Sequence, residues 1–81
     1  MKYTYVLLCS DEKLYIGCTA DLRKRLTRHK RGQVAATKNR LPVKLIYYEA
    51  CLSVGAARKR EKYFKTGFGR RYLNGDTLTI E

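Results

Sequence analysis

The sequence predicts an α/β (α+β) domain in which helices flank a three-stranded, mostly antiparallel sheet, in the order β-β-α-β-α. One observation is a pair of short runs rich in aromatic and aliphatic residues, 2–9 and 14–17, separated by a polar turn at residues 10–13; this is the pattern of a β-hairpin. Another is a third strand-like run, 43–50, that stands between two helical segments. Because 81 residues can bury one modest core, we expect a single domain over residues 1–81.

The hairpin follows from side-chain alternation. A strand over residues 2–9 places alternate side chains on one face, and that face carries Tyr3, Tyr5, Leu7 and Cys9. The second strand, 14–17, ends at Gly17, and we expect this glycine to open the turn into the first helix.

Polar caps mark the starts of both helices. Thr19 or Asp21 can cap a first helix over about residues 20–32, and Ser53 can cap a second helix over about residues 53–65. Each helix is followed or closed by a glycine, which tolerates the left-handed conformation common at helix ends.

The remaining segments are predicted to be loops and a tail. Residues 33–42 are polar and basic and include Pro42, which indicates a loop. Gly67 is expected to end the second helix, residues 69–74 to add a short turn, and residues 75–81 to form a tail or a brief edge strand.

The charge of the chain favours a polyanionic partner. Eighteen Lys and Arg against seven Asp and Glu give a net charge of +11, which attracts nucleic acid; a solvated basic surface is the alternative. The positive charge is concentrated in residues 23–40 and 58–71. We therefore expect DNA, or alternatively RNA, to contact Arg23, Lys24, Arg28, Lys30, Arg31, Lys38, Arg40, Arg70 and Arg71.

The cysteines and the hydropathy indicate a soluble, cytoplasmic protein. Cys9, Cys18 and Cys51 show neither a CxxC pattern nor Cys/His spacing, so we expect reduced, buried or half-buried thiols rather than disulfides or a zinc site. No apolar run approaches the roughly 18 residues of a membrane helix, and the amino terminus lacks a signal-peptide pattern. We expect no membrane partner.

Two polar residues fall on the apolar face of the first helix. At 100° per residue, Arg25 and His29 lie on the same face as Leu22 and Leu26, where an arginine is costly unless it meets an anion or reaches a cleft. The basic residues of the outer face suit phosphate contact.

The second helix repeats the pattern with an acid. Glu61 shares a face with Val54, Ala57 and Phe64, so a partly buried Arg25–Glu61 ion pair between the helices is one interpretation. The other is a catalytic group: with Tyr5 and Tyr15 from the hairpin, these residues would converge on a single sheet face. One carboxylate can hold Mg²⁺, whose other ligands are water and substrate phosphate, and Arg25 can bind that phosphate.

These residues resemble the motifs of the GIY-YIG endonuclease superfamily, most closely the small single-domain proteins similar to the nuclease domain of the excinuclease C subunit. The two tripeptides after which the superfamily is named correspond here to Tyr3, Thr4 and Tyr5, without the initial glycine, and to Tyr15, Ile16 and Gly17. Arg25, His29 and Glu61 follow in the family's order, and Asn74 falls where the family often has a polar residue near the site.

The resemblance implies a one-metal phosphodiesterase. Tyr5 would act as, or help position, the general base, and Tyr15 would orient the water or the phosphate. Arg25 would stabilise the transition state, Glu61 would bind Mg²⁺ or Mn²⁺, and His29 would assist proton transfer or hold a tyrosine.

Other residues would have supporting roles: Tyr3, Gly17, Lys13 and Asn74. Lys13 could lower the pKa of a tyrosine or be a simple turn residue. The sequence leaves open whether Tyr5 or Tyr15 is the general base.

We therefore expect a metal-dependent DNA endonuclease, structure-selective or weakly sequence-specific, in repair or recombination. The family usually joins this module to a separate DNA-binding domain. We expect no such domain within residues 1–81, and therefore no strong sequence specificity. A second copy of the chain or a recruiting protein is an expected partner. The alternatives are a nucleic-acid-binding module with weak or no catalysis and a small basic RNA-associated protein.

Overall fold

The computed structural model describes residues 1–66. Its element order confirms the predicted β-β-α-β-α arrangement. The elements are β1 (Lys2–Leu8), β2 (Leu14–Thr19), α1 (Leu22–Lys30), β3 (Lys44–Cys51) and α2 (Val54–Phe64). The predictions for Gly67, for the turn at 69–74 and for the tail at 75–81 lie outside the described residues.

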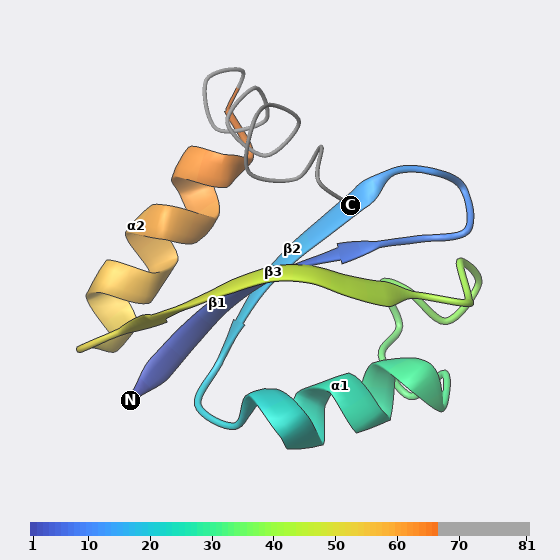
Figure 1. Ribbon diagram of the computed structural model, residues 1–81, viewed down its shortest axis with the longest axis horizontal. Helices are drawn as coiled ribbons and strands as arrows, with labels where there is room; N and C mark the ends of the chain where they lie inside the picture. The colour runs from blue at the N-terminus through green and yellow to red at the C-terminus, as the bar shows by residue number, and fades with distance from the viewer. Residues whose placement is uncertain (67–81) are drawn as a thin grey trace.

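The three strands form one antiparallel sheet in the order β2-β1-β3, so that within residues 1–66 β2 is an edge strand. The two helices cover opposite faces of this sheet (Figure 1). On the α1 side, Tyr5 and Leu7 of β1 pack with Leu22 and Leu26. On the α2 side, Val6 and Ile16 pack with Phe64 of α2. The side-chain alternation of β1 therefore supplies both halves of the core.

The caps form as the sequence predicts. The Asp21 carboxylate accepts the backbone N–H of Lys24 at 3.0 Å, and the Ser53 hydroxyl accepts that of Ala56 at 3.1 Å. Of the two candidate caps for α1, Asp21 is the one used. Gly32 follows α1 with φ of +73°, in the left-handed region that glycine adopts without strain.

Two sequence predictions are wrong in the fold. Gly17 does not open a turn, because β2 continues to Thr19 and Gly17 pairs with Tyr5 inside the sheet. Val54 is not buried with the rest of its predicted helix face. It stands at the first turn of α2 and is 47% exposed, whereas Ala57 and Phe64 of the same face are buried.

The loop after α1 is anchored to the hairpin turn. The backbone carbonyl of Val34 accepts the N–H groups of Thr37 and Lys38, and the N–H of Arg40 bonds the carbonyl of Thr37 at 2.9 Å. The carbonyl of Arg40 in turn accepts the N–H of Ser10 in the β1–β2 turn at 3.0 Å. These bonds fix the position of Thr37 beside α1. Within residues 1–66, neither helix has the length and apolar character that crossing a bilayer requires.

Candidate active site

A buried hydrogen-bonded chain joins β1, α1 and the following loop. The hydroxyl oxygen of Tyr5 lies 2.8 Å from Nε2 of His29, and Nδ1 of His29 lies 2.7 Å from the hydroxyl oxygen of Thr37. All three residues are 0% exposed. The sequence wheel placed His29 on the buried face of α1, and Tyr5 and Thr37 satisfy both of its ring nitrogens there.

Gly17 makes room for this series of hydrogen-bonded side chains. A Cβ at Gly17 would stand 2.7 Å from the Tyr5 hydroxyl oxygen and 3.1 Å from the ring of Tyr15. The two tyrosine rings are 6.3 Å apart, and the Tyr15 ring is 5.3 Å from the His29 ring. The predicted supporting role of Gly17 therefore comes from its missing side chain, which lets the Tyr5 ring cross β2 at close range.

A cleft of about 430 Å³ lies beside β2. The strand contributes Tyr15, Gly17 and Cys18, α1 contributes Arg25, and α2 contributes Arg58, Glu61, Lys62 and Lys65. Because α1 and α2 cover opposite faces of the sheet, the expectation that the site residues converge on a single face is wrong. They meet around the edge strand instead.

Glu61 lines this cleft with both carboxylate oxygens engaged. The Cys18 thiol donates to Oε1 at 2.8 Å, and the ammonium group of Lys65 donates to Oε2 at 2.9 Å. Partial burial opposes ionisation, but the bonds from Cys18 and Lys65, with the charges of Lys65 and Arg58, outweigh it and lower the pKa of Glu61. The carboxylate is therefore ionised and held on one side of the cleft at neutral pH.

Arg25 and Glu61 do not form the sealed ion pair that the sequence left open. Within residues 1–66 the ion-pair partner of Glu61 is Lys65, and both Arg25 and Glu61 line the open cleft. An arginine and a carboxylate that face the same solvent space can together bind an anion and a cation.

The buried groups have shifted proton affinities. Burial and the neighbouring Tyr15 raise the pKa of Tyr5 to about 12, although the Arg25 guanidinium partly offsets the rise. Burial, followed by the charges of Arg25 and Arg28, lowers the pKa of His29. Burial and the Glu61 carboxylate raise the pKa of the Cys18 thiol to about 11. At neutral pH the Tyr5 phenol, the Cys18 thiol and the His29 imidazole are therefore uncharged.

Two predicted supporting residues lie away from the cleft. Tyr3 packs edge-on against Tyr48, with ring centroids 6.3 Å apart, and lines a different pocket beside the start of α1. Lys13 lies in the exposed β1–β2 turn and does not line the cleft. Asn74, which is also predicted to support the site, lies outside the described residues.

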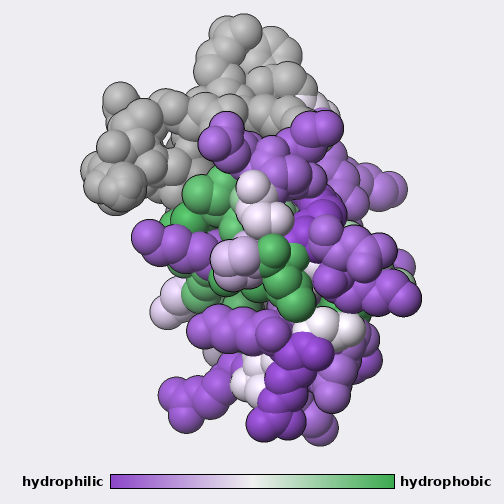
Figure 2. All heavy atoms as spheres, turned by 90° about the vertical axis from the view of Figure 1, so that its right-hand side faces the viewer, coloured by the Kyte–Doolittle hydropathy of each residue, from purple (hydrophilic) through white to green (hydrophobic). Residues whose placement is uncertain are grey.

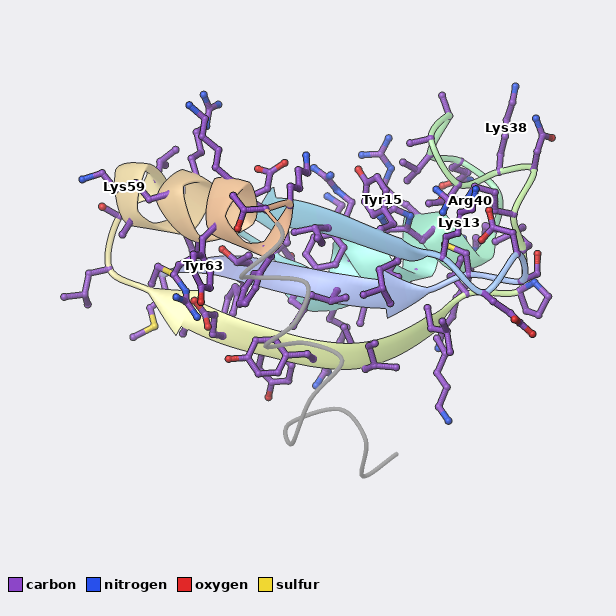
Figure 3. The ribbon with its side chains drawn as sticks, turned by 90° about the horizontal axis from the view of Figure 1, so that it is seen from above. Lys13, Tyr15, Lys38, Arg40, Lys59 and Tyr63 are labelled. Carbon is purple, nitrogen blue, oxygen red and sulfur yellow. The ribbon has the colours of Figure 1, made fainter. Side chains whose placement is uncertain are left out.

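The predicted phosphate-binding residues are mostly exposed. Those in and after α1 that remain open to solvent are Arg23, Lys24, Arg28, Lys30, Arg31 and Lys38. Arg40 differs, because its guanidinium pairs with Asp11 in the hairpin turn at 2.9 Å. Lys13, Lys38 and Arg40 gather at the end of the sheet that holds this turn (Figure 3), and hydrophilic side chains dominate that end around a smaller apolar area (Figure 2). Arg70 and Arg71 lie outside the described residues.

The sequence reasoning missed five residues of the site. Arg58, Lys62 and Lys65 line the cleft around Glu61, and their spacing along α2 could have placed them on its face. Cys18 follows Gly17 in β2 and so points to the other side of the sheet, toward α2. Thr37 carries no pattern that a sequence could show, because the folded loop alone places it against His29.

The donor set suits a hard divalent cation held by one carboxylate. Within residues 1–66 no group of three or more His, Cys, Asp or Glu side chains could enclose a metal ion. Mg²⁺ does not need such an enclosure, because it keeps several waters and takes further ligands from phosphate. Glu61 fits this role provided that Lys65 yields Oε2, which an exposed lysine can do at small cost.

Known proteins share both the sequence and the fold. The GIY-YIG catalytic domain family matches residues 1–74. The UPF0213 protein SpyM50708 of Streptococcus pyogenes (strain Manfredo) is 52% identical over 64 residues, which are 78% of this chain and 70% of that protein. The UPF0213 protein of strain MGAS10270 matches to the same extent. The solution NMR structure of the UPF0213 protein BH0048 from Bacillus halodurans has a TM-score of 0.57 and 29% identity, covering 91% of this chain and 83% of that one. The chain therefore belongs to the GIY-YIG catalytic domain family, a family of nucleases.

Proposed function

We propose that the protein is a metal-dependent endonuclease that hydrolyses DNA phosphodiester bonds, with structural or weak sequence preference, in repair or recombination. The observation that carries this proposal is the cleft at the β2 edge, where Tyr15, Arg25 and Glu61 face one solvent space. A cation, an anion-binding arginine and a hydroxyl are the groups that phosphodiester hydrolysis uses.

Each of these residues has a role that suits its position. Arg25 binds the scissile phosphate through two N–H groups and stabilises the charge that develops on it. Glu61 binds Mg²⁺ or Mn²⁺ after Lys65 releases its oxygen. The bound metal ion supplies stabilisation of negative charge at the phosphate and at the leaving oxygen.

The positions of the two tyrosines support different roles. Tyr15 lines the cleft, which places it to contact the attacking water or the phosphate. Tyr5 is fully buried behind Gly17 and bonded to His29. We assign Tyr15 to the orientation of the nucleophile, and Tyr5 and His29 to the buried support of the cleft.

The basic surface supports DNA as the substrate class. Six exposed cations in and after α1 can neutralise backbone phosphates without reading bases. A second copy of the chain would allow cleavage of both strands, and a recruiting protein would supply selectivity that this basic surface does not.

A cleavage assay on branched, nicked and single-stranded DNA, with RNA as a further substrate, tests the proposal. We expect cleavage of at least one DNA in Mg²⁺ or Mn²⁺, none in EDTA, and loss of cleavage in Arg25→Ala. The matched control is Arg23→Ala at saturating DNA, because Arg23 lies on the same helix but outside the cleft, so that its loss weakens DNA binding without changing the saturated rate.

Three results would contradict the proposal. Metal-independent cleavage, or equal activity in the two arginine variants, would exclude this site. Tight DNA binding without cleavage on any substrate or metal would establish the non-catalytic binding module instead.

A further inference from the structure

The chain from Tyr5 through His29 ends at Thr37, a residue to which no role in the cleft has been assigned. The two hydrogen bonds, 2.8 and 2.7 Å long, use both nitrogens of the only histidine in the sequence. A neutral imidazole carries one N–H and one acceptor nitrogen. The direction of one bond therefore fixes the direction of the other.

Arg25 sets the direction at the Tyr5 end of the chain. The Tyr5 hydroxyl packs against Gly17, which lines the same cleft as Arg25, and the positive charge of the guanidinium partly offsets the rise in the pKa of this hydroxyl. A guanidinium has donors only, so the Tyr5 proton is repelled from Arg25. The acceptor available to that proton is Nε2 of His29.

The same reasoning fixes the other end. If Nε2 accepts the Tyr5 proton, the single imidazole proton is on Nδ1 and is donated to the hydroxyl oxygen of Thr37. Both donors then point the same way, from Tyr5 to His29 and from His29 to Thr37. The Tyr5 oxygen keeps its lone pairs toward Arg25.

The loop holds Thr37 in the position that this chain needs. The backbone N–H and carbonyl of Thr37 bond Val34 and Arg40, and Arg40 bonds the β1–β2 turn through its backbone carbonyl and its side chain. Thr37 is 0% exposed, so water does not compete for the Nδ1 proton.

We propose that Thr37 is a positioning residue that accepts the Nδ1 proton of His29 and thereby keeps the lone pairs of the Tyr5 oxygen directed toward the cleft that Arg25 lines. The effect on cleavage rests on the proposed nuclease function, whereas the tautomer of His29 does not. Without the Thr37 hydroxyl, a proton on Nδ1 has no acceptor, and the lone pairs of the Tyr5 oxygen are no longer directed toward Arg25.

The test is the tautomer of His29 in the full chain, read from the two imidazole nitrogens in a long-range ¹H–¹⁵N NMR spectrum at pH 7.5. We expect Nδ1 to be protonated in the wild type and in Thr37→Ser, which keeps the hydroxyl. In Thr37→Val, which has a similar shape but no hydroxyl, we expect a shift toward the Nε2–H tautomer or a mixture. Thr27→Val is the control, because Thr27 lies exposed on α1 and bonds the Arg23 carbonyl instead.

Cleavage gives the second readout. Thr37→Val is expected to lose about tenfold in rate, at the low end of what an outer partner of a functional histidine contributes, and Thr37→Ser to restore it. An Nε2–H tautomer in the wild type, or unchanged imidazole signals in a folded Thr37→Val, would overturn the proposal. If Thr37→Val does not fold, the wild-type tautomer still tests the proposal, because an Nε2–H imidazole would overturn it. Absence of cleavage in every variant, with Nδ1 protonated, would refute the nuclease function and leave the hydrogen-bonded chain established.

Discussion

The Tyr5 hydroxyl oxygen lies 2.7 Å from the point where a Cβ of Gly17 would stand. Gly17 is directly opposite Tyr5 in the pairing of β1 with β2, so the tyrosine ring passes over a strand position that has no side chain. This contact lets Tyr5 reach His29. Gly17 also lines the cleft, so it lies between the solvent there and the buried hydrogen bonds of Tyr5, His29 and Thr37. The glycine of the Tyr-Ile-Gly motif is therefore a packing requirement of the site.

Gly17→Ala should destabilise the protein by about 1–3 kcal/mol, because the added methyl group overlaps a buried ring that cannot move outward. Urea unfolding measures this as a lower midpoint with an unchanged m value. The control is Gly55→Ala in the first turn of α2, where the nearest atom would be 3.9 Å away. That variant should be as stable as the wild type, or up to about 1 kcal/mol more stable. Equal stability of the Gly17→Ala variant and the wild type would contradict the contact.

The free energy of unfolding should fall as the pH drops below about 6.5. His29 has a folded-state pKa below its usual value of 6.5, so the unfolded chain binds a proton that the folded chain excludes, and protonation favours unfolding. Above pH 6.5 this contribution is complete, and below it stability declines by at most about 1.4 kcal/mol per pH unit. His29 is the only histidine in the sequence, so urea titrations between pH 5 and 8 isolate it. A flat profile, or greater stability at pH 5, would show that His29 is not buried as a neutral group.

Lys65→Met should tighten binding of Mn²⁺, because Lys65 occupies one oxygen of Glu61. A half-exposed ion pair contributes up to about 1 kcal/mol, so we expect a two- to fivefold lower Kd, measured by electron paramagnetic resonance of the free ion. Lys62→Met is the matched control, since Lys62 lines the same cleft without bonding Glu61 in the described part of the chain. Equal affinities in the two lysine variants would contradict the competition, and unchanged affinity in Glu61→Gln would place the metal elsewhere.

Substitutions of Arg40 and Lys38 should have separate effects, one on the stability of the protein and the other on its DNA binding. Arg40→Gln breaks the pair with Asp11 and should cost up to about 1 kcal/mol of stability, with little change in how DNA affinity depends on salt. Lys38→Gln removes an exposed charge and should reduce the slope of log K against log salt by about 0.9 per lost phosphate contact. Fluorescence anisotropy at several salt concentrations gives both slopes. A smaller salt slope in Arg40→Gln, with unchanged stability, would show that Arg40 contacts the phosphates.

The sequence was sufficient for the features that depend on local pattern. Alternation in residues 2–9 predicts which side chains of β1 share a face. The candidate caps, Thr19 or Asp21 and then Ser53, predict the starts of the helices to within a few residues. The helical wheel also places His29 inside, because a periodicity of 3.6 residues records which face of a helix is buried.

The remaining features depend on how the elements meet. A wheel shows that Glu61 shares a face with Ala57, but it does not show that α2 covers the face of the sheet opposite to α1. The site therefore forms around an edge strand, which no pattern within one segment predicts. The contacts of Thr37 and of Cys18 arise between residues 8 and 43 positions apart, and the Arg40–Asp11 pair likewise depends on loop geometry.

The central claim is that Glu61 binds the metal ion on which DNA cleavage depends. The most direct measurement is the single-turnover cleavage rate of a branched DNA across a Mg²⁺ titration, in the wild type and in Glu61→Gln. We predict that the wild-type rate rises with Mg²⁺ to a plateau. We also predict that Glu61→Gln loses at least about 100-fold, equivalent to about 2.7 kcal/mol, while its DNA affinity in EDTA is unchanged. A Glu61→Gln variant that cleaves at the wild-type rate with the same Mg²⁺ dependence would contradict the account.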